Sequence, residues 1–535
     1  MRKALLPAIL LLFLALQSPA QLFINGGTFF IDVGAVVSVQ GDVTSNIDIT
    51  GTGKLLLNGT AAQNLNMGSH TIPNLEVNNT NNAVLTGACR IGSTMVFTNG
   101  KVWAGNYNFL LGASATVTGA GAGKFVTTNG TGFCQKEVTA DFAALILPVG
   151  VGADYLPVSL TNSGSTYSSA IVGARALSSA YPTPIRPVRT ESYLTAYWKV
   201  TKSGVTGGTL SGTATYVDSR ITGTEADLRA MSYNGTTWSL TGGSQNNGAN
   251  TITATLGAAS TDLYAMNRFL LIRPKTFLQG AYNSGTGLMS DLLRNGSGAY
   301  TPGTVPASNV VPTTDPYRSA PYNTTFTHVS NAVAETVTAQ AFQDKNVADS
   351  NVVDWVFCEL RNPGSTVVQT RAALVLSNGA IVDIDGVSPL YFKNVDAGSY
   401  TIAVRHRNHL GISSNPANPV ALSLTAANYD FTTSATLNGT PGVAYTVINA
   451  KNVMWGGNAN SNTVTNYSGL NNDRIYVLNT LLGGNPIATI TNTYSAGDVS
   501  MNRTVSYSGL NNDRIFILNS VIGGNALGSQ TQQLP

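Results

Sequence analysis

The sequence predicts a mainly all-β protein made of several modules. Three observations support this fold class. Only 10% of the 535 residues are charged, whereas an average soluble domain has about 25%. Gly, Thr, Ser, Asn and Ala replace the missing charges, and this mixture suits strands and turns better than amphipathic helices. Short β-branched runs that end at Gly or Asn recur along the chain, and a duplicated segment of helical pattern lies near its C-terminal end.

The first twenty residues have the pattern of a cleaved export signal. Two basic residues precede the apolar run 4–16, which is shorter than a membrane-spanning helix. Ser18-Pro19-Ala20 supplies the small residues that suit cleavage before Gln21. We therefore expect a secreted or cell-surface protein, with no membrane insertion after the signal (residues 1–20) is removed.

Residues 21–125 are predicted to form a parallel β-helix-like region, with a plain β-sandwich as the alternative. Strand-like runs recur about every twenty residues, as expected when coils stack on one another. Asparagines such as those at 78–82 would lie at the corners, because Asn tolerates a left-handed backbone. The predicted strands are 28–33, 36–39, 43–49, 54–57, 74–77, 83–85, 93–97, 101–103, 109–111 and 115–117.

Two further β modules are predicted after this region. Residues 126–268 have strand-like runs about ten residues apart, which favours an antiparallel β-sandwich. Residues 269–430 are expected to form a sandwich of immunoglobulin or fibronectin-III type, with 354–360 and 372–376 as neighbouring central strands. Aromatic side chains of the first of these modules are interpreted as core anchors, with stacking on sugars as the alternative: Tyr197, Trp198, Tyr233 and Trp238.

The cysteines and the histidines each allow two structural interpretations. The three cysteines are too few for a disulfide scaffold in an exported chain of this length. Cys89 and Cys134 either pair with each other or are buried free thiols. His406 and His409 have a spacing that suits a metal on a helix, but the alternating residues before them predict a strand.

The strongest internal signal is a duplication of forty residues near the C-terminus. The segment Tyr467-Ser468-Gly469-Leu470-Asn471-Asn472-Asp473-Arg474-Ile475 recurs in full at 507–515. Each copy continues into a short apolar-periodic segment, 475–482 and 515–522, and ends at a pair of glycines. A capping residue, helical spacing and a terminal glycine predict a short helix in each copy of this tandem repeat, residues 431–535.

The loop before each helix alternates oxygen-bearing side chains with other residues, as EF-hand-like calcium loops do. A later aspartate would complete each set of ligands. The candidates are Asn458, Asn460, Asn462 and Asp473 in the first copy, and Asp498, Ser500, Asn502 and Asp513 in the second.

Both loops depart from a good Ca²⁺ site. The first has amides only, with Thr463 where glycine is expected, so its site is predicted to be dead or very weak. The second keeps Asp498 but has Arg503 at the glycine position, so calcium binding there is predicted to be marginal. Alternatively, Asn472-Asp473 and Asn512-Asp513 merely cap the helices.

Several motifs of the C-terminal half occur together with this repeat. They are Phe277-Leu278-Gln279-Gly280-Ala281-Tyr282, Gly287-Leu288-Met289, Asp354-Trp355-Val356, Val404-Arg405-His406-Arg407-Asn408-His409-Leu410-Gly411, both Asn-Asn-Asp-Arg copies and the Leu534-Pro535 tail. Together they resemble a family of multidomain exported bacterial proteins with dockerin-like C-termini. The resemblance covers residues 269–535 and implies a docking tail; the N-terminal half resembles surface β-helix proteins loosely.

We expect an exported structural or adhesive surface protein that binds a protein partner through residues 431–535. The alternative is a protein that binds or degrades surface polysaccharide and is attached through a dockerin-like tail; a third reading adds calcium-controlled assembly. The acids of the β-helix-like region are scattered, so no carboxylate pair for glycoside hydrolysis is evident. No nucleophile elbow, P-loop or dinucleotide fingerprint occurs, which favours a non-catalytic protein. The net charge of +3 is thinly spread, which argues against nucleic acid.

Overall fold

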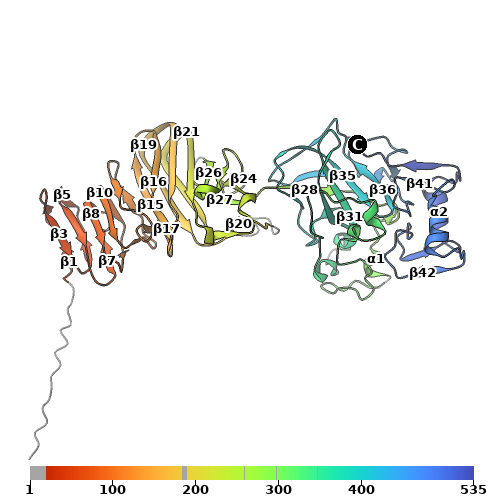
Figure 1. The fold of residues 1–535 in the computed structure, drawn as a ribbon, viewed down its shortest axis with the longest axis horizontal. Helices are drawn as coiled ribbons and strands as arrows, with labels where there is room; N and C mark the ends of the chain where they lie inside the picture. The colour runs from red at the N-terminus through yellow and green to blue at the C-terminus, as the bar shows by residue number, and fades with distance from the viewer. Residues whose placement is uncertain (1–19, 183–189, 258–259, 297, 346–347) are drawn as a thin grey trace, which may run out of the picture. The chain divides into compact units, whose positions relative to one another are not determined.

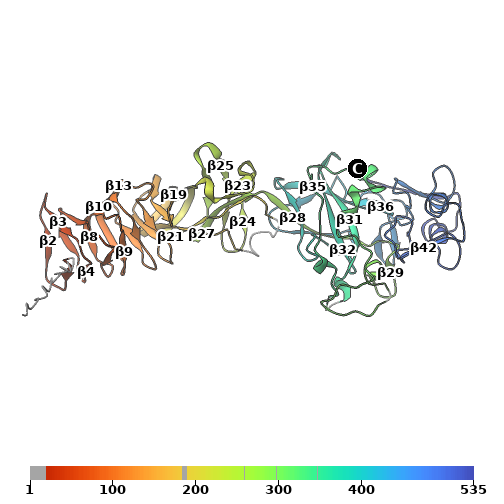
Figure 2. The ribbon, with the colours of Figure 1, turned by 60° about the horizontal axis from the view of Figure 1, so that its bottom comes forward.

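The computed structural model describes residues 20–182, 190–257, 260–296, 298–345 and 348–535. Strands dominate this part of the chain (Figure 1, Figure 2). The chain divides into two compact units, Met1–Asn267 and Arg268–Pro535. Among the described residues, no helix is long and apolar enough to cross a membrane.

The first unit begins as a stack of parallel coils, which confirms the predicted β-solenoid-like arrangement. Aligned residues such as Gln63 and Ala83 are about twenty positions apart, so one coil contains about twenty residues. One ladder consists of β1 (Leu22–Ile24), β4 (Val43–Ser45), β7 (Gln63–Asn66), β9 (Ala83–Leu85), β11 (Val102–Trp103), β14 (Val126–Thr127) and β17 (Val149–Val151). A second consists of β3 (Val36–Val39), β6 (Lys54–Leu57), β8 (Thr71–Asn78), β10 (Cys89–Asn99), β12 (Phe109–Leu111) and β15 (Cys134–Val138).

Columns of apolar side chains fill the interior of the coils. Alternate residues of each strand point inward, and parallel pairing places like positions of successive coils above one another. Leu55, Leu75 and Met95 form one such column and are fully buried. Each such side chain stabilises the fold by about 1.5–3 kcal/mol relative to its exposed state.

Asparagines hold the corners between coils, as the sequence suggests. The Asn99 amide donates to Asn78 Oδ1 of the coil before at 2.7 Å. Asn79 Nδ2 donates to Gln63 Oε1 at 2.9 Å, and Asn82 has a positive φ of 77°. These bonds satisfy polar groups where the ladders are interrupted.

All three cysteines are buried free thiols, so the Cys89–Cys134 disulfide considered above is wrong. Cys89 is aligned with Phe109, and Phe109 with Cys134. The two thiols are therefore two ladder steps apart, or about 9.5 Å, which exceeds the reach of a disulfide. Burial raises the pKa of both thiols to about 12.

The parallel stack changes into an antiparallel sheet at β15 and does not end at residue 125. β15 is parallel to β12 on one side and antiparallel to β19 (Val158–Leu177) on the other. β19 then pairs along most of its length with β21 (Tyr197–Thr215). The same sheet adds β16 (Phe142–Leu147), β23 (Leu228–Tyr233), β26 (Thr251–Leu256) and β27 (Ser260–Asn267).

The aromatic side chains of this sheet lie mainly in its core. Trp198 is fully buried, and its indole N–H donates to Leu156 O at 2.9 Å. Tyr197 and Tyr233 are also buried, and each packs against the ring of Tyr181. Trp238 is partly exposed and stacks on Tyr233 at 4.9 Å between ring centroids. These contacts fit the interpretation as core anchors.

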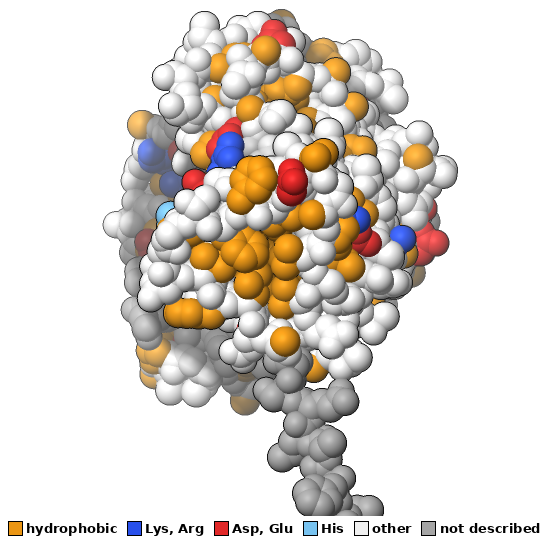
Figure 3. All heavy atoms as spheres, turned by 90° about the vertical axis from the view of Figure 1, so that its left-hand side faces the viewer, with side chains coloured by type: hydrophobic (Ala, Val, Ile, Leu, Met, Phe, Trp, Pro, Cys, Tyr) orange, Lys and Arg blue, Asp and Glu red, His pale blue; other side chains and the backbone are white. Residues whose placement is uncertain are grey.

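Apolar side chains gather on the face of the first unit shown in Figure 3. The first coil contributes to exposed apolar surface with Phe23, Phe30, Val33 and Val36, which are 51–78% exposed. Phe23 and Phe30 are aligned with Thr44 and Thr50 of the next coil. The outward side of the first coil is therefore more apolar than that of the second.

The second unit is built around a mostly antiparallel sheet. Its order is β33 (Ile381–Val382), β32 (Val367–Leu376), β31 (Val352–Arg361), β35 (Gly398–His406) and β36 (His409–Ser413). β31 is buried along nearly its whole length, and Phe357 is aligned with Ala372 of β32. One hydrophobic core joins this sheet to later residues such as Phe431, Met454 and Met501. The boundary predicted at residue 430 therefore lies inside one compact unit.

Candidate docking surface of the C-terminal repeat

Each copy of the repeat contains one short helical segment. α2 (Asp473–Ile475) continues into the wider π-helical turn η8 (Tyr476–Leu481), and α3 (Asp513–Ile515) continues into η9 (Phe516–Val521). The segments begin two residues before the predicted 475–482 and 515–522. Glycine pairs with positive φ follow both of them, because the left-handed backbone that ends a helix favours glycine.

The two copies exchange strands. β41 (Val464–Asn466), which precedes the first helix, pairs with β44 (Ser529–Thr531), which follows the second. Conversely, β42 (Thr489–Thr491) pairs with β43 (Thr504–Ser506). Each copy thus completes the other, and their apolar stripes share a small core.

A serine in each copy binds the opposite copy. Ser468 Oγ donates to Ala526 O, and Ser508 Oγ donates to Pro486 O, each at 2.5 Å. These equivalent bonds hold the start of each helical segment against the turn that follows the other.

The aspartates at the helix starts hold the preceding loops. Asp473 Oδ2 accepts from the Asn466 N–H at 2.8 Å, and Oδ1 accepts from that of Asn460 at 3.3 Å. In the second copy, Asp513 Oδ2 accepts from the Ser506 N–H at 2.9 Å and Oδ1 from that of Val499 at 3.0 Å. Burial raises the pKa of both carboxyl groups to about 7.

The other candidate calcium ligands also contact loop backbone. In the first copy, Asn458 Nδ2 donates to Asn462 O, Asn460 Oδ1 accepts from the Asn462 N–H, and Asn462 Oδ1 accepts from the Val464 N–H. In the second, the Asp498 oxygens accept from the N–H groups of Asn502 and Arg503, and Asn502 Oδ1 accepts from that of Thr504.

The second loop has the better ligand chemistry for a cation. Ser500 Oγ donates to Asp513 Oδ1 at 3.1 Å. The charge of Asp498 adds to burial in raising the pKa of Asp513, and Asp513 Oδ1 accepts from the N–H of Val499, the residue after Asp498. Two neighbouring carboxylates and a hydroxyl are hard oxygen ligands. Calcium binding stays a prediction for both loops.

Asparagine caps both helices. The Asn472 side chain accepts from the Ile475 N–H at 2.9 Å, and that of Asn512 accepts from the Ile515 N–H at 3.0 Å. The same amides donate to Gly469 O and Gly509 O. Arg474 and Arg514 lie over the rings of Tyr467 and Tyr507 at 4.7 and 5.0 Å. These caps and ring contacts explain why the asparagine, arginine and tyrosine of the motif occur in both copies.

Leu470 and Leu510 are the exceptions within the motif. They are 89% and 93% exposed, so packing does not explain why both copies have leucine there. Ile487 and Leu527 also occupy equivalent positions and are 80% and 88% exposed. The hydrogen bond from Ser468 to Ala526 joins the segment of Leu470 to the segment of Leu527. The equivalent bond from Ser508 to Pro486 joins the segment of Leu510 to the segment of Ile487. We call these pairs the two leucine patches.

An open hollow lies beside the first leucine patch. Its volume is about 600 Å³, and its lining includes Leu470, Asn471, Ile475 and Tyr476. The sequence signal for this surface was the exact repetition of an apolar residue before the helix of each copy.

A buried relay of hydrogen bonds links the sheet to the repeat. The Gly280 N–H donates to His409 Nε2 at 3.0 Å, which assigns the His409 proton to Nδ1. That nitrogen lies 3.0 Å from His406 Nδ1, and His406 Nε2 lies 3.0 Å from Asp354 Oδ2. Both ring nitrogens of each histidine are therefore occupied by protein partners, which does not suit a metal site.

Asp354 is the charged end of this relay. It accepts from Arg407 Nε at 3.0 Å and from the Tyr494 hydroxyl at 2.7 Å. Although burial opposes ionisation, the charge of Arg407 and the hydrogen bond from His406 lower the pKa of Asp354 to about 2. Burial lowers the pKa of both His406 and His409, so the imidazoles are neutral.

Further bonds attach the repeat to the sheet. Asn408 Nδ2 donates to Asp498 O at 2.7 Å, and Gln279 Nε2 donates to Ser520 O at 2.8 Å. The motifs at 277–282, 354–356 and 404–411 thus meet at one internal contact. Comparisons with known protein families, curated proteins and solved structures found no match to this chain.

Proposed function

We propose that the chain is an exported, non-catalytic structural or adhesive surface protein that docks to a protein partner through residues 431–535. The observation that supports this function best is the pair of leucine patches. An exposed leucine gains about 1.5–3 kcal/mol when a partner buries it, and the fully buried core of a protein interface is more apolar than the surface around it.

The remaining modules have supporting roles in this proposal. The coils at the start of the chain serve as a stalk after removal of the signal at 1–20. The antiparallel pairing of β19 with β21 supports a β-sandwich for the segment up to residue 268. The sheet around β31 supports an immunoglobulin-like or fibronectin-III-like module, with the dockerin-like repeat packed against it.

Calcium control of docking is a second candidate. The neighbouring Asp498 and Asp513 support it, because burial raises the pKa of both acids and a bound cation would favour their ionised forms. Such a cation would tie the second loop to its helix and so order the surface near Leu510.

The test is retention of the protein on the surface of cells that produce it. The double variant Leu470→Asp/Leu510→Asp places charges on both leucine patches, so we expect at least a tenfold loss of surface-bound protein. The melting temperature should change little, because both side chains are exposed.

Val387→Asp is the matched control, since Val387 is 73% exposed outside the repeat; it should be retained like the natural chain. Equal retention of all three proteins would refute docking through the leucine patches.

A further inference from the structure

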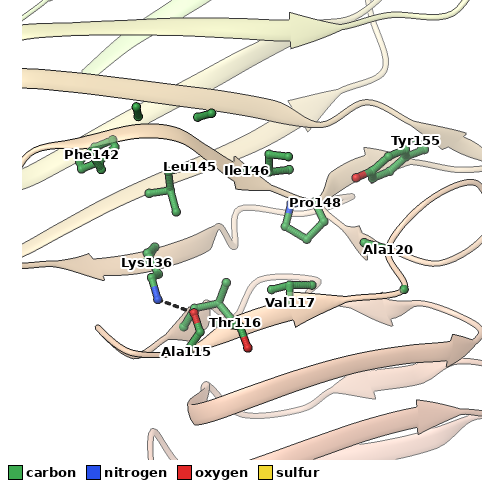
Figure 4. A pocket seen from close by; sticks show the side chains of 14 residues that line it. Ala115, Thr116, Val117, Ala120, Lys136, Phe142, Leu145, Ile146, Pro148 and Tyr155 are labelled. Atoms are coloured by element: carbon green, nitrogen blue, oxygen red, sulfur yellow. Dashed lines mark hydrogen bonds between the residues drawn. The ribbon is translucent and has the colours of Figure 1, made fainter.

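The first unit contains a hollow at the point where the parallel coils meet the antiparallel sheet (Figure 4). Its volume is about 540 Å³, within the usual range of small-molecule sites. Its lining combines polar groups with apolar side chains, among them Leu111, Val117, Leu145, Ile146 and Pro148.

Two strands face this hollow without bonding to each other. β13 (Thr116–Thr118) pairs with β10 alone, and β16 pairs with β19 alone, among the pairings of the described residues. The neighbouring β12 and β15 are joined by a regular ladder. The opening is therefore a local splay in an otherwise continuous sheet, and its walls retain unpaired backbone groups.

Lys136 is the charged side chain of this hollow. It is 7% exposed, and its Nζ donates to Gly112 O and Ala115 O at 2.6 Å each. An ammonium group has three N–H donors, so two bonds to neutral carbonyls leave one donor for another acceptor.

No acid of the described residues forms an ion pair with Lys136. The adjacent Glu137 is engaged with Arg90, whose two nitrogens bind its carboxylate at 2.8 Å. Buried charges in proteins are normally paired, and burial lowers the pKa of Lys136. Thr116 and Tyr155 add hydroxyl groups to the lining, and Figure 4 shows the Tyr155 oxygen directed toward Pro148.

We propose that this hollow binds an organic carboxylate with a slender apolar body, whose carboxylate pairs with Lys136. The apolar body lies between Val117 of β13 and the side chains of Leu145 and Ile146 of β16. A fatty acid and the C-terminus of an apolar peptide share this chemistry. The site lies in the first unit and does not depend on docking through the repeat.

The test is calorimetric titration of the mature chain with decanoate and, separately, with decan-1-ol. A second pair of ligands is an acetylated Leu-Val-Ile peptide with a free carboxylate and the same peptide as its amide. We expect one molecule of decanoate or of the free-acid peptide to bind, at least tenfold more tightly than its uncharged counterpart. Tighter binding of decanoate would identify the ligand as a fatty acid, and tighter binding of the free-acid peptide would identify it as a peptide C-terminus.

Two variants probe the opposite ends of the hollow. Lys136→Met keeps the apolar stem and removes the charge, and Ile146→Asp alters a side chain that is 55% exposed. Each should weaken decanoate binding at least tenfold, whereas Lys202→Met, outside the hollow, should not. The second variant remains informative if loss of Lys136 impairs folding.

Equal affinity of the natural chain for decanoate and decanol would overturn the proposed pairing of a carboxylate with Lys136. Equal affinity of the natural chain and Lys136→Met for decanoate would overturn it as well. Absence of binding by all four ligands at millimolar concentration would overturn the site itself.

Discussion

At the scale of single residues, the buried relay from Gly280 to Asp354 connects segments that are far apart in sequence. The sequence showed these motifs but not their contact, because residues 354, 406 and 494 are brought together only by the fold. His406 and His409 suggested a metal by spacing, and their nitrogens instead bind each other, Asp354 and Gly280.

Asp354→Asn tests the energetic weight of this relay. It leaves the buried Arg407 without its charged partner, and we expect a loss of about 3–5 kcal/mol in the free energy of unfolding of the second unit. Because the folded pKa of Asp354 is about 2 and the unfolded value is 3.8, the natural chain keeps this stabilisation above pH 4 and loses it as the pH falls toward 2.

Denaturant titrations at several pH values measure both effects. Asp385→Asn in an exposed turn is the control and should cost less than about 1 kcal/mol. Equal losses in the free energy of unfolding for the two variants would show that the relay contributes nothing specific to stability.

At the scale of elements, local patterns predicted strands well where alternation and turn residues agree. The predicted strands 36–39, 54–57, 83–85 and 109–111 coincide with β3, β6, β9 and β12. The predicted strand 43–49 instead spans β4, a corner and β5 (Ile49–Gly51), because the run contains the turn-forming residues Asn46 and Asp48. The change to antiparallel pairing at β15 was not predictable, since pairing direction depends on distant partners.

Leu75→Ala tests the stacked columns of the coils. Leu75 lies between Leu55 and Met95 in register, so we expect a loss of about 2–5 kcal/mol from the first unit through a cavity that cannot collapse. Leu56→Ala, on the half-buried outward side of β6, should cost less than half as much. Thermal melting followed by circular dichroism measures both, and equal losses would contradict a column-filled interior.

At the scale of the whole molecule, the repeat is not separable from the sheet that it contacts. The boundary predicted at residue 430 separated the sheet from the tandem repeat. The core nevertheless continues across this point, through Phe431, Met454 and Met501. The sequence did not single out Leu470 and Leu510, because the repetition of an apolar residue does not show whether the fold covers it.

A fragment that ends at residue 430 should therefore fail to fold. We expect residues 268–535 to melt cooperatively and residues 268–430 to show no cooperative transition, because truncation uncovers the core and leaves Asp354 without Tyr494. Residues 21–267 should melt alone as the positive control. A cooperative transition of the 268–430 fragment would show that the sheet is an autonomous domain.

The strand exchange between the two copies makes the repeat a clasp with two catches. β44 follows the second helix, yet it pairs with the strand that precedes the first helix. A chain clipped before Ser529 would lose the partner of β41 but keep the pairing of β42 with β43. Trimming by a protease at this place would thus leave the edge of β41 uncovered, while the residues of both leucine patches would stay in the chain.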